Sequence, residues 1–381
     1  MKIPICKPYI TDEEHRAMLK SFASGWVSQG PRVQEFEAAF AKMTGARHAV
    51  ATNSCTAAMH LTLLALGVGP GDEVIVPSFT FVATANAVEY TGAHPVFCDV
   101  RPVTFNISPE DFERRITSRT RAVMPVHQFG LMADMSAINE IADKHGIFVV
   151  EDAACATGAT RGRVHAGAFG IAGCFSFHPR KVITTGEGGM ITTGDEQLAE
   201  RARILRSHGA SVSDFERHKG GGFILPDYDV LGFNYRMTDL HASMGLRQLD
   251  KLDRILDVRR RRAEYYTERL ESIPGATPQA VPKDVFHPYQ SYVVVLDDNL
   301  DRDAMGAAME ARGVATRQGA HAVHALGYYR NKYGAAPDQC PVSTRLAAQT
   351  MALPLFPQLS RLEQKHVIEC LVDAMESCQR S

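Results

Sequence analysis

Residues 175–189 read Phe175-Ser176-Phe177-His178-Pro179-Arg180-Lys181-Val182-Ile183-Thr184-Thr185-Gly186-Glu187-Gly188-Gly189. The lysine follows an apolar, strand-like run and precedes glycines that let the backbone pass close to a ligand. Asp152 stands upstream, just after the apolar run 147–150 and Glu151. Because ligands gather beyond the carboxyl ends of strands in parallel sheets, Lys181 and Asp152 are candidates for one site.

An amine and a carboxylate at one site suggest pyridoxal 5'-phosphate (PLP). The amine holds the aldehyde of PLP as a Schiff base, and the carboxylate keeps the pyridine nitrogen protonated. A carboxylate about 4 Å from that nitrogen, at an effective dielectric of about 20, gives roughly 4 kcal/mol of attraction, or about three pKa units. Lys181 and Asp152 are therefore predicted to be catalytic. Taken alone, each has an ordinary alternative: a solvated lysine and an aspartate that caps a helix.

The composition is that of an ordinary globular protein. The 381 residues exceed the roughly 250 to 300 at which a single core stops growing, so two domains are expected. Hydrophobic residues make up 45% of the chain and charged residues 22%. With 41 Lys and Arg against 43 Asp and Glu, the net charge of −2 offers no general attraction for nucleic acid or anionic lipid. Neither nucleic acid nor a membrane is expected as a partner.

The N-terminus and the cysteines indicate a cytoplasmic protein. Residues 1–8 contain prolines and lysines and lack the apolar segment of a signal peptide. The most apolar stretch, residues 74–88, includes a proline and several polar residues, unlike a spanning helix of about 20 apolar residues. The 8 cysteines are scattered, with no CxxC pair and no Cys/His spacing typical of zinc. Reduced thiols and no metal site are expected.

Strand-like runs alternate with helix signals along the chain. Ser108 and Pro109 are typical of a helix start, and a helical pattern runs from Asp134 to Gly146. This alternation predicts an α/β fold in which a mostly parallel sheet lies between layers of helices. The apolar runs that should form its strands are residues 73–76, 95–98, 122–126, 147–150 and 174–177.

A long helical pattern over residues 238–270 should lead into a smaller domain. Its arginine cluster, residues 259–262, lies among acidic residues and is expected to be a solvated helix face rather than an anion site. A strand is predicted at 291–296, and helices at 301–312 and 359–378. We expect a large domain over residues 1–245, N-terminal segment included, and a small α+β domain over residues 246–381.

Small hydroxylated residues precede an almost wholly apolar helix at Ser54-Cys55-Thr56. The N-terminus of such a helix aims free backbone N–H groups and a positive dipole end at whatever lies before it. A phosphate would fit there, with Ser54 and Thr56 as ligands. Simple capping of a core helix is the alternative. Ser176 is a further candidate, because it stands near the end of the strand before Lys181.

These segments resemble the DegT/DnrJ/EryC1/StrS family of sugar aminotransferases, PLP enzymes of fold type I, over nearly the whole chain. Residues 175–189 carry the resemblance most specifically. Supporting segments occur in the family's order at residues 24–30 (SGWVSQG), 54–61 (SCTAAMHL), 77–84 (PSFTFVAT), 151–154 (EDAA) and 232–237 (GFNYRM). The implied fold is a mostly parallel sheet sandwiched by helices, followed by a smaller α+β C-terminal domain.

The resemblance implies roles for the matching residues. Lys181 would be the Schiff-base lysine, Asp152 the partner of the pyridinium, and Phe81 an aromatic ring stacked on the cofactor. Asn234 would reach the phosphate of the neighbouring subunit, which implies a homodimer with shared active sites. The phosphate of PLP would be held by Ser54, Cys55, Thr56 and Ser176.

Two positions depart from the family pattern. Cys155 stands where many relatives have a glutamine that contacts the cofactor, and Thr157 where histidine is common. Cys155 is kept among the predicted cofactor-binding residues, with a small buried residue as the alternative. Four further side chains are candidates for substrate contact, with structural roles as the alternative: His178, Arg236, His321 and His324.

The resemblance implies transfer of an amino group from L-glutamate to a nucleotide-linked keto sugar, a 4-keto-6-deoxyhexose, in amino-sugar synthesis for a polysaccharide or an antibiotic. The mechanism would be ping-pong, with pyridoxamine phosphate (PMP) as the intermediate form. A 3-keto sugar or keto-cyclitol acceptor and a PLP-binding regulator without turnover are the alternatives. Related dehydratases have histidine in place of the lysine, so Lys181 argues against that activity. Sugar choice is expected to depend on loops such as residues 211–228.

Overall fold

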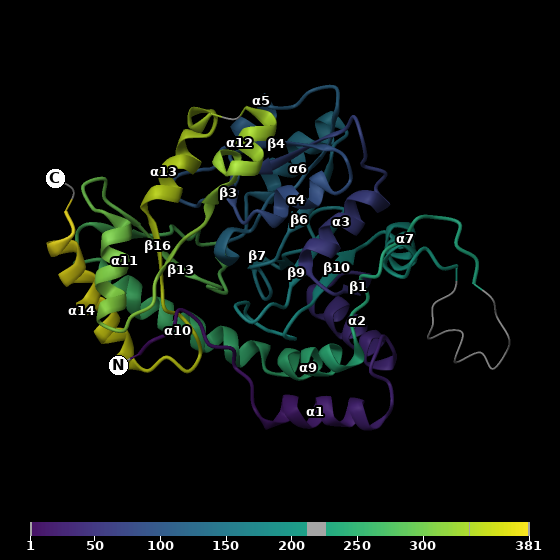
Figure 1. Ribbon diagram of the computed structural model, residues 1–381, viewed down its shortest axis with the longest axis horizontal. Coiled ribbons are helices and arrows are strands. Elements are labelled where there is room, and N and C mark those ends of the chain that lie inside the picture. The colour runs from purple at the N-terminus through teal and green to yellow at the C-terminus, as the bar shows by residue number, and fades with distance from the viewer. Residues whose placement is uncertain (1, 212–225, 335, 380–381) are drawn as a thin grey trace.

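The computed structural model describes residues 2–211, 226–334 and 336–379 (Figure 1). Within these ranges, seven strands form one sheet in the order β1-β10-β9-β6-β5-β2-β4. Both pairings of β10, with β1 and with β9, are antiparallel, and the other pairings among these strands are parallel, which confirms the mostly parallel sheet predicted from the alternation. The strands are β1 (His48–Thr52), β2 (Glu73–Pro77), β4 (His94–Cys98), β5 (Thr120–Val123), β6 (Phe148–Asp152), β9 (Ala172–Ser176) and β10 (Gly189–Thr193).

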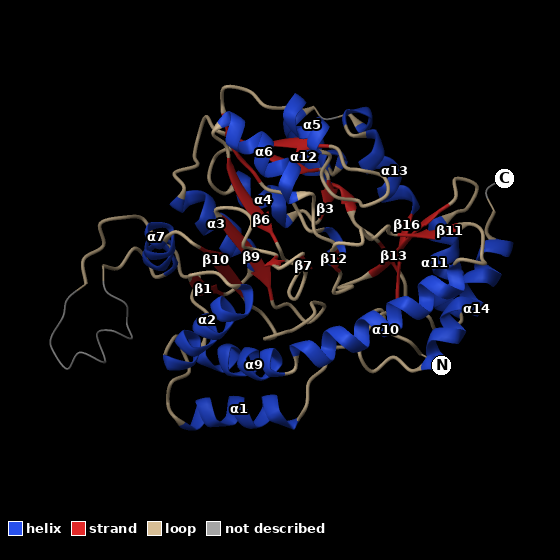
Figure 2. Cartoon of the chain, turned by 180° about the vertical axis from the view of Figure 1, so that it is seen from behind, coloured by secondary structure: helices blue, strands red, loops and turns tan. Residues whose placement is uncertain are grey.

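Helices cover both faces of this sheet, as the view from behind also shows (Figure 2). Successive residues of β6 point to opposite faces: Val150 packs in the core with α3 and α4, and Val149 packs with α6. Phe40 of α2 packs against Phe175 of β9 on the second face. The helices around the sheet include α2 (Pro31–Thr44), α3 (Cys55–Ala65), α4 (Ala83–Glu89), α5 (Pro109–Arg114), α6 (Met135–His145), α7 (Glu196–Arg206), α9 (Asp239–Asp250) and α12 (Gly327–Tyr333).

A second core surrounds a four-stranded sheet in the order β11-β13-β16-β14. Ile3 belongs to this core and bridges to Val314, so the first residues pack on the C-terminal part of the chain. In the other direction, β15 (His321–Ala322) pairs with β3 (Phe79–Thr80). In each of these two contacts, a residue before the domain boundary predicted at residue 245 pairs with a residue after it. The elements of this part are α10 (Leu252–Leu270), α11 (Arg302–Ala311), α13 (Pro341–Gln349), α14 (Arg361–Ser377), β11 (Ala276–Pro278), β13 (Tyr292–Leu296), β14 (Arg317–Gln318) and β16 (Thr350–Leu353).

The single long helix expected over residues 238–270 is two helices, α9 and α10, which meet at Lys251. The amide of Lys251 bonds to the carbonyl of Gln248, three residues back, instead of continuing the α-helical pattern. Its side chain donates to Thr11 Oγ1 and pairs with Glu14 of α1 (Asp12–Ala23). Packing against α1 thus ends α9 at Asp250, although the apolar pattern of the sequence continues into α10.

The arginine cluster is not the fully solvated face that was expected. Arg259 is 1% exposed, and its guanidinium donates to the carbonyls of Tyr289 and Gln290. These carbonyls come from a loop that is distant in sequence, so the acidic neighbours of the cluster do not reveal the burial. Arg261 does lie on an exposed face, where it pairs with Asp257.

Candidate active site

The strand register brings the predicted site residues to one edge of the main sheet. Thr52 at the end of β1 is paired with Gly189, and Gly189 is paired with Ser176 at the end of β9. On the other side of β9, Cys174 is paired with Asp152 at the end of β6. The start of α3, Ser176 and Asp152 therefore lie in a row at the carboxyl edge of the parallel strands, where open α/β sheets bind ligands.

Asp152 is a buried carboxylate, 4% exposed, that accepts two hydrogen bonds. Thr84 Oγ1 donates to its Oδ2 at 2.8 Å, and the amide of Ala154 donates to its Oδ1 at 3.1 Å. Burial raises the pKa of Asp152, although these two bonds and the charge of Lys181 act in the opposite direction. In the described part of the chain, no cation forms an ion pair with it. A buried carboxylate in this state suits a cationic ligand such as a protonated pyridine nitrogen.

Lys181 is carried by a closed turn after β9. Its amide donates to the carbonyl of His178 at 2.8 Å. The amide of Thr185 and the hydroxyl of Thr184 both donate to the carbonyl of Phe177, at 3.0 and 2.8 Å. These bonds fix the backbone that presents the lysine to the edge of the sheet.

The amine of Lys181 meets the end of β6. Lys181 Nζ donates to Cys155 Sγ at 3.2 Å, and Cys155 lies three residues after Asp152. Burial lowers the pKa of Lys181, but Cys155, Cys55 and Asp152 outweigh this effect and raise it. The structure thus brings the predicted lysine, carboxylate and cysteine together.

The N-terminus of α3 opens toward the same edge. Ser54 caps the helix by accepting a bond from the amide of Ala57 at 3.1 Å, so its hydroxyl proton stays available to a ligand. Thr56 is partly buried, and its hydroxyl makes no hydrogen bond to any described residue. Cys55 instead donates its thiol to the carbonyl of Cys174 at 3.4 Å. Of the predicted phosphate ligands, Cys55 can therefore offer only its backbone amide.

Gly189 allows β10 to pass directly beside this helix start. A Cβ at Gly189 would lie 2.4 Å from the carbonyl carbon and oxygen of Ser54 and 2.6 Å from the amide nitrogen of Cys55. Ser176, 8% exposed, accepts a long bond from the amide of His178 at 3.5 Å and keeps its own proton to donate. These hydroxyls and the free amides of α3 form a cradle suited to a phosphate.

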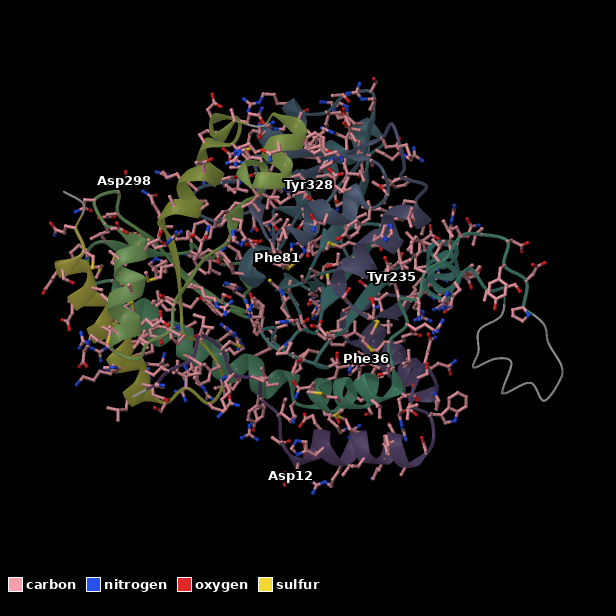
Figure 3. All side chains as sticks on the ribbon, viewed as in Figure 1. Asp12, Phe36, Phe81, Tyr235, Asp298 and Tyr328 are labelled. Atoms are coloured by element: carbon pink, nitrogen blue, oxygen red, sulfur yellow. The ribbon has the colours of Figure 1, made fainter. Side chains whose placement is uncertain are left out.

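Phe81 is 66% exposed, which is unusual for a large aromatic side chain, and it lies near the centre of the view in Figure 3. It stands just before α4, and its carbonyl accepts the amide of Thr84 at 3.2 Å. The same helix start therefore positions an open aromatic face and the hydroxyl that holds Asp152. His321, partly buried on β15, is paired with Thr80, the residue before Phe81.

The remaining histidine candidates differ in access. His324 is 0% exposed, and its Nδ1 is hydrogen-bonded to the hydroxyl of Ser78. This burial is contrary to the substrate contact that was predicted for His324. His178 is partly buried, and its Nδ1 accepts the amide of Arg180 at 3.3 Å. Burial lowers the pKa of His178. A neutral imidazole is therefore the form that stands beside the lysine turn.

Asn234 and Arg236 lie on a segment that runs beside the start of α3. Asn234 is exposed, and its carbonyl accepts the side-chain amide of Asn53 at 3.5 Å. The amide of Asn53 in turn donates to the carbonyl of Tyr235 at 2.9 Å. Arg236 is partly buried, and burial together with the nearby charge of Arg206 lowers its pKa. Neither side chain forms an ion pair or hydrogen bond with a described residue.

Two further residues, Thr84 and His127, were not predicted to belong to the site. The only indication for Thr84 was its place in the segment 77–84, which resembles the family. His127 is fully buried and donates from Nε2 to Glu151 Oε2 at 2.8 Å, because its Nδ1 accepts the amide of Ala133. Glu151, the residue before Asp152 on β6, points to the opposite face of the strand. There its carboxylate also accepts the amides of Gly167, Phe169 and Gly170.

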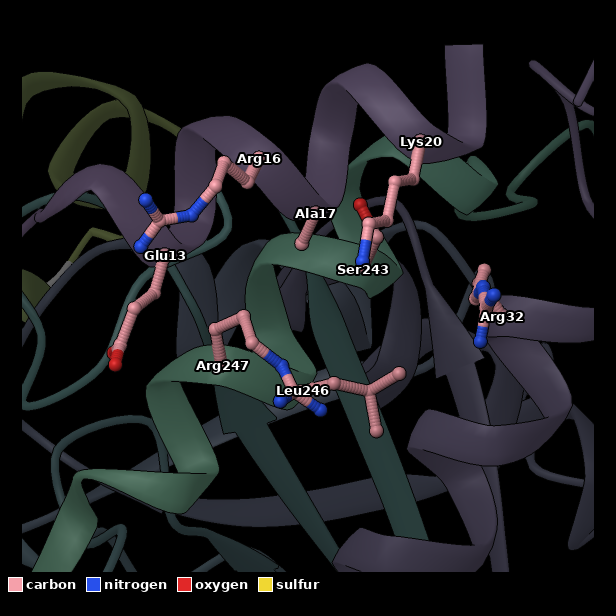
Figure 4. Close-up of a pocket in the computed structure, with 8 residues that line it drawn as sticks. All are labelled: Glu13, Arg16, Ala17, Lys20, Arg32, Ser243, Leu246 and Arg247. Atoms are coloured by element: carbon pink, nitrogen blue, oxygen red, sulfur yellow. The ribbon is translucent and has the colours of Figure 1, made fainter. Parts of the chain in front are cut away.

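A groove lies between α1 and α9 (Figure 4). It is lined by Glu13, Arg16, Ala17, Lys20, Arg32, Ser243, Leu246 and Arg247, none of which belongs to the predicted site.

In the parts of the chain that the structure describes, no group of three or more His, Cys, Asp or Glu side chains could hold a metal ion. Over the same ranges, no helix is both long and apolar enough to cross a membrane.

Comparison with known proteins gives full-length matches. Residues 8–372 match the DegT/DnrJ/EryC1/StrS aminotransferase family. The spore coat polysaccharide biosynthesis protein SpsC of Bacillus subtilis is 40% identical over 98% of this chain and 97% of its own. Spr1654 of Streptococcus pneumoniae, solved in its PMP form, superposes with a TM-score of 0.94 and 28% identity over 99% of this chain and 100% of its own. PseC of Helicobacter pylori, an aminotransferase involved in the biosynthesis of pseudoaminic acid, gives 0.92 and 26% over 99% and 100%.

The residues at the sheet edge fit the cofactor of these neighbours. Spr1654 is also known in a PLP form, and the predicted fold of a PLP-dependent transferase is confirmed by likeness along the whole chain. The buried Asp152 suits the pyridine nitrogen, the open face of Phe81 suits the ring, and the amine of Lys181 suits the aldehyde. The hydroxyl-lined N-terminus of α3 suits the phosphate.

Proposed function

The chain belongs to the DegT/DnrJ/EryC1/StrS aminotransferase family and is a PLP-dependent enzyme, and from this premise we propose that it moves an amino group from L-glutamate to a nucleotide-linked keto sugar. The proposed acceptor is a 4-keto-6-deoxyhexose. The names of two relatives support a sugar, because SpsC belongs to polysaccharide biosynthesis and PseC to pseudoaminic acid biosynthesis. The observation that carries the reaction type is the meeting of Lys181, Asp152 and the start of α3 at one sheet edge.

In this proposal each residue has a defined task. PLP, when bound, supplies an electron-poor ring that stabilises the charge left on an amino acid when a proton departs. Lys181 Nζ would hold the cofactor. When the amine is no longer bonded to the cofactor, it would take the Cα proton of glutamate and later deliver a proton to the sugar carbon that receives the amino group. Asp152 holds a proton on the ring nitrogen, because Thr84 favours its ionised form. The phosphate is held by Ser54, Thr56 and Ser176.

We also propose a homodimer in which each subunit contributes to the other's site. Asn234 is exposed and follows a segment, residues 228–231, in which Tyr228 is 56% exposed and Leu231 is 88% exposed. A second copy covering this segment would bury its exposed apolar side chains and bring Asn234 toward the partner's phosphate cradle. Light scattering should then report a dimer, and Asn234→Ala should weaken PLP binding. The proposed domain division stays at residues 1–245 and 246–381.

One experiment tests the covalent role of Lys181. Borohydride reduction of the PLP-loaded protein, followed by peptide mass analysis, should find a pyridoxyl group on Lys181. The variant Lys181→Ala serves as the control and should carry no adduct at that peptide. An adduct on another lysine, or none, would overturn the assignment of Lys181 as the covalent anchor.

A second experiment tests the donor and the acceptor. The protein is incubated with L-glutamate and a panel of nucleotide-linked 4-keto sugars, 3-keto sugars and keto-cyclitols, and 2-oxoglutarate is measured. Catalytic 2-oxoglutarate formation with a 4-keto-6-deoxyhexose supports the proposal. Turnover only with a 3-keto sugar or a keto-cyclitol would identify that alternative, since the same residues serve all three. PLP binding without turnover of any pair would favour a regulator.

A further inference from the structure

Cys155 and Lys181 meet across the ends of two paired strands. Cys155 follows β6, Lys181 follows β9, and these strands run parallel with Asp152 opposite Cys174. Lys181 Nζ donates to Cys155 Sγ at 3.2 Å. The two residues are separated by 26 positions in the sequence, so the contact is made by the fold.

The backbones on both sides of this contact are fixed. The amide of Ala153 donates to the carbonyl of Cys174 at 2.9 Å, and the amide of Ala156 donates to the carbonyl of Ala153 at 2.9 Å. Across from them, two hydrogen bonds to the carbonyl of Phe177 close the lysine turn. A different side chain at position 155 would therefore change what Nζ contacts without requiring either turn to move.

Other groups near the amine are already engaged. The carboxylate of Asp152 accepts bonds from Thr84 and the amide of Ala154, and the thiol of Cys55 donates to a backbone carbonyl. On the lysine's own turn, His178 accepts an amide, and Arg180 presents a like charge. Cys155 is thus the one hydrogen-bond partner of Nζ among the residues that the structure describes.

We propose that Cys155 is a positioning residue, which holds the free amine of Lys181 at the cofactor edge by accepting a hydrogen bond from it. The neutral amine is the form that attacks the aldehyde of PLP. This role concerns attachment of the cofactor, so it does not depend on the identity of the donor or the sugar.

The first test measures PLP capture by the cofactor-free protein. Stopped-flow absorbance gives the capture rate against pH for wild type, Cys155→Ala and Cys155→Ser. Because Cys155 raises the pKa of Lys181, Cys155→Ala should shift the pH midpoint of capture downward by about half a unit to one unit. The rate on the high-pH plateau should fall about three- to tenfold, because the amine is no longer oriented. Cys155→Ser keeps an acceptor and should recover most of the plateau rate.

The matched control is Cys378→Ala, a partly buried cysteine at the end of α14, which should behave as wild type. Thermal unfolding of each variant separates positioning from packing, since a purely structural role would lower the melting temperature and leave the pH midpoint in place. An unchanged midpoint and plateau in Cys155→Ala would mean that the cysteine only fills space, and the proposal would fail.

The second test needs no cofactor. Iodoacetamide alkylation of Cys155 at pH 8 is followed by peptide mass analysis in wild type and in Lys181→Met, whose side chain keeps similar length without the charge. Loss of the neighbouring ammonium should slow alkylation of Cys155 about threefold or more, because a nearby cation favours the thiolate. Cys378 in the same digest is the internal standard. Equal rates at Cys155 with and without Lys181 would overturn the proposal, whatever the capture data show.

Discussion

Thr84 donates its hydroxyl proton to Asp152 Oδ2 at 2.8 Å, although the two residues are 68 positions apart. The start of α4 brings the hydroxyl over the end of β6, where both residues are buried. Burial raises the pKa of Asp152 and the bond from Thr84 lowers it, because a donor favours the charged carboxylate. Thr84 therefore influences how well Asp152 can hold a cation on the cofactor.

Thr84→Val should weaken PLP binding, because valine keeps the shape and removes this donor. A hydrogen bond to a charged group contributes about 1.5 to 3 kcal/mol, so we expect about a tenfold loss of PLP affinity or more near neutral pH. The affinity should recover as the pH rises, because the carboxylate then ionises without the donor. Fluorescence titration measures the dissociation constant. Thr91→Val, a buried threonine bonded to the carbonyl of Val88, is the control, and equal losses in both variants would contradict the prediction.

Phe81→Ala should separate cofactor binding from stability. Phe81 and Phe22 are both 66% exposed, so each alanine variant should change the free energy of unfolding by less than about 0.5 kcal/mol. Stacking on a ring contributes about 0.5 to 1.5 kcal/mol, so only Phe81→Ala should weaken PLP binding, by up to about tenfold. Phe81→Tyr should retain binding. The stacking role would be refuted by PLP affinities that are equal in the Phe81→Ala and Phe22→Ala variants.

Gly189→Ala should disrupt the start of α3. The added Cβ would lie 2.4 Å from backbone atoms of Ser54, which cannot rotate away as a side chain could. We expect a loss of about 2 to 4 kcal/mol in the free energy of unfolding together with weaker PLP binding. Gly194→Ala, just beyond the same strand, has no atom within 4 Å of its added Cβ and should behave as wild type. Equal stability of the two variants would show that β10 can move away from the helix.

Features of the fold could be predicted from the sequence where neighbouring residues alone determine them. The strands of the main sheet, and the position of Asp152 at the end of one of them, could be predicted because apolar runs alternate with helix signals. The position of Lys181 just after a strand could be predicted in the same way. The break at Lys251 and the burial of Arg259 could not, because both depend on segments that are distant in the sequence. The pairing of Thr84 with Asp152 was hidden for the same reason.

The substrate-contacting residues were the hardest part of the site to predict from the sequence. His321 and His324 are three positions apart, yet the first is partly buried beside β3 and the second is fully enclosed. That difference follows from how residues 321–325 pack on the main sheet, and no local pattern marks it. Of the loop expected to select the sugar, residues 212–225 lie outside the described residues. The role of that loop stays a prediction.

Glu14 should make the stability of the protein depend on acid pH. Its carboxylate is fully buried, pairs with Lys251, and accepts bonds from Gln248 Nε2 at 2.7 Å and from the amide of Thr11 at 2.8 Å. Burial alone would raise the pKa of Glu14, but these partners together lower it to about 2. Because the unfolded carboxylate takes up a proton near pH 4.5, the stabilisation is complete above that pH and is lost as the pH falls toward 2.

Glu14→Gln should therefore lower the free energy of unfolding at pH 7 by about 2 to 3 kcal/mol, as expected when hydrogen bonds to a buried charge are lost. The difference from wild type should shrink as the pH is lowered toward 3, because wild type then loses the same contribution. Urea unfolding at several pH values measures both effects. Glu13→Gln is the matched control, since Glu13 is 55% exposed and 3.7 Å from Lys251, and it should cost less than about 0.5 kcal/mol. A Glu14→Gln deficit that stays constant from pH 7 to pH 3 would show that the carboxylate's charge is not what α1 uses to hold the junction between α9 and α10.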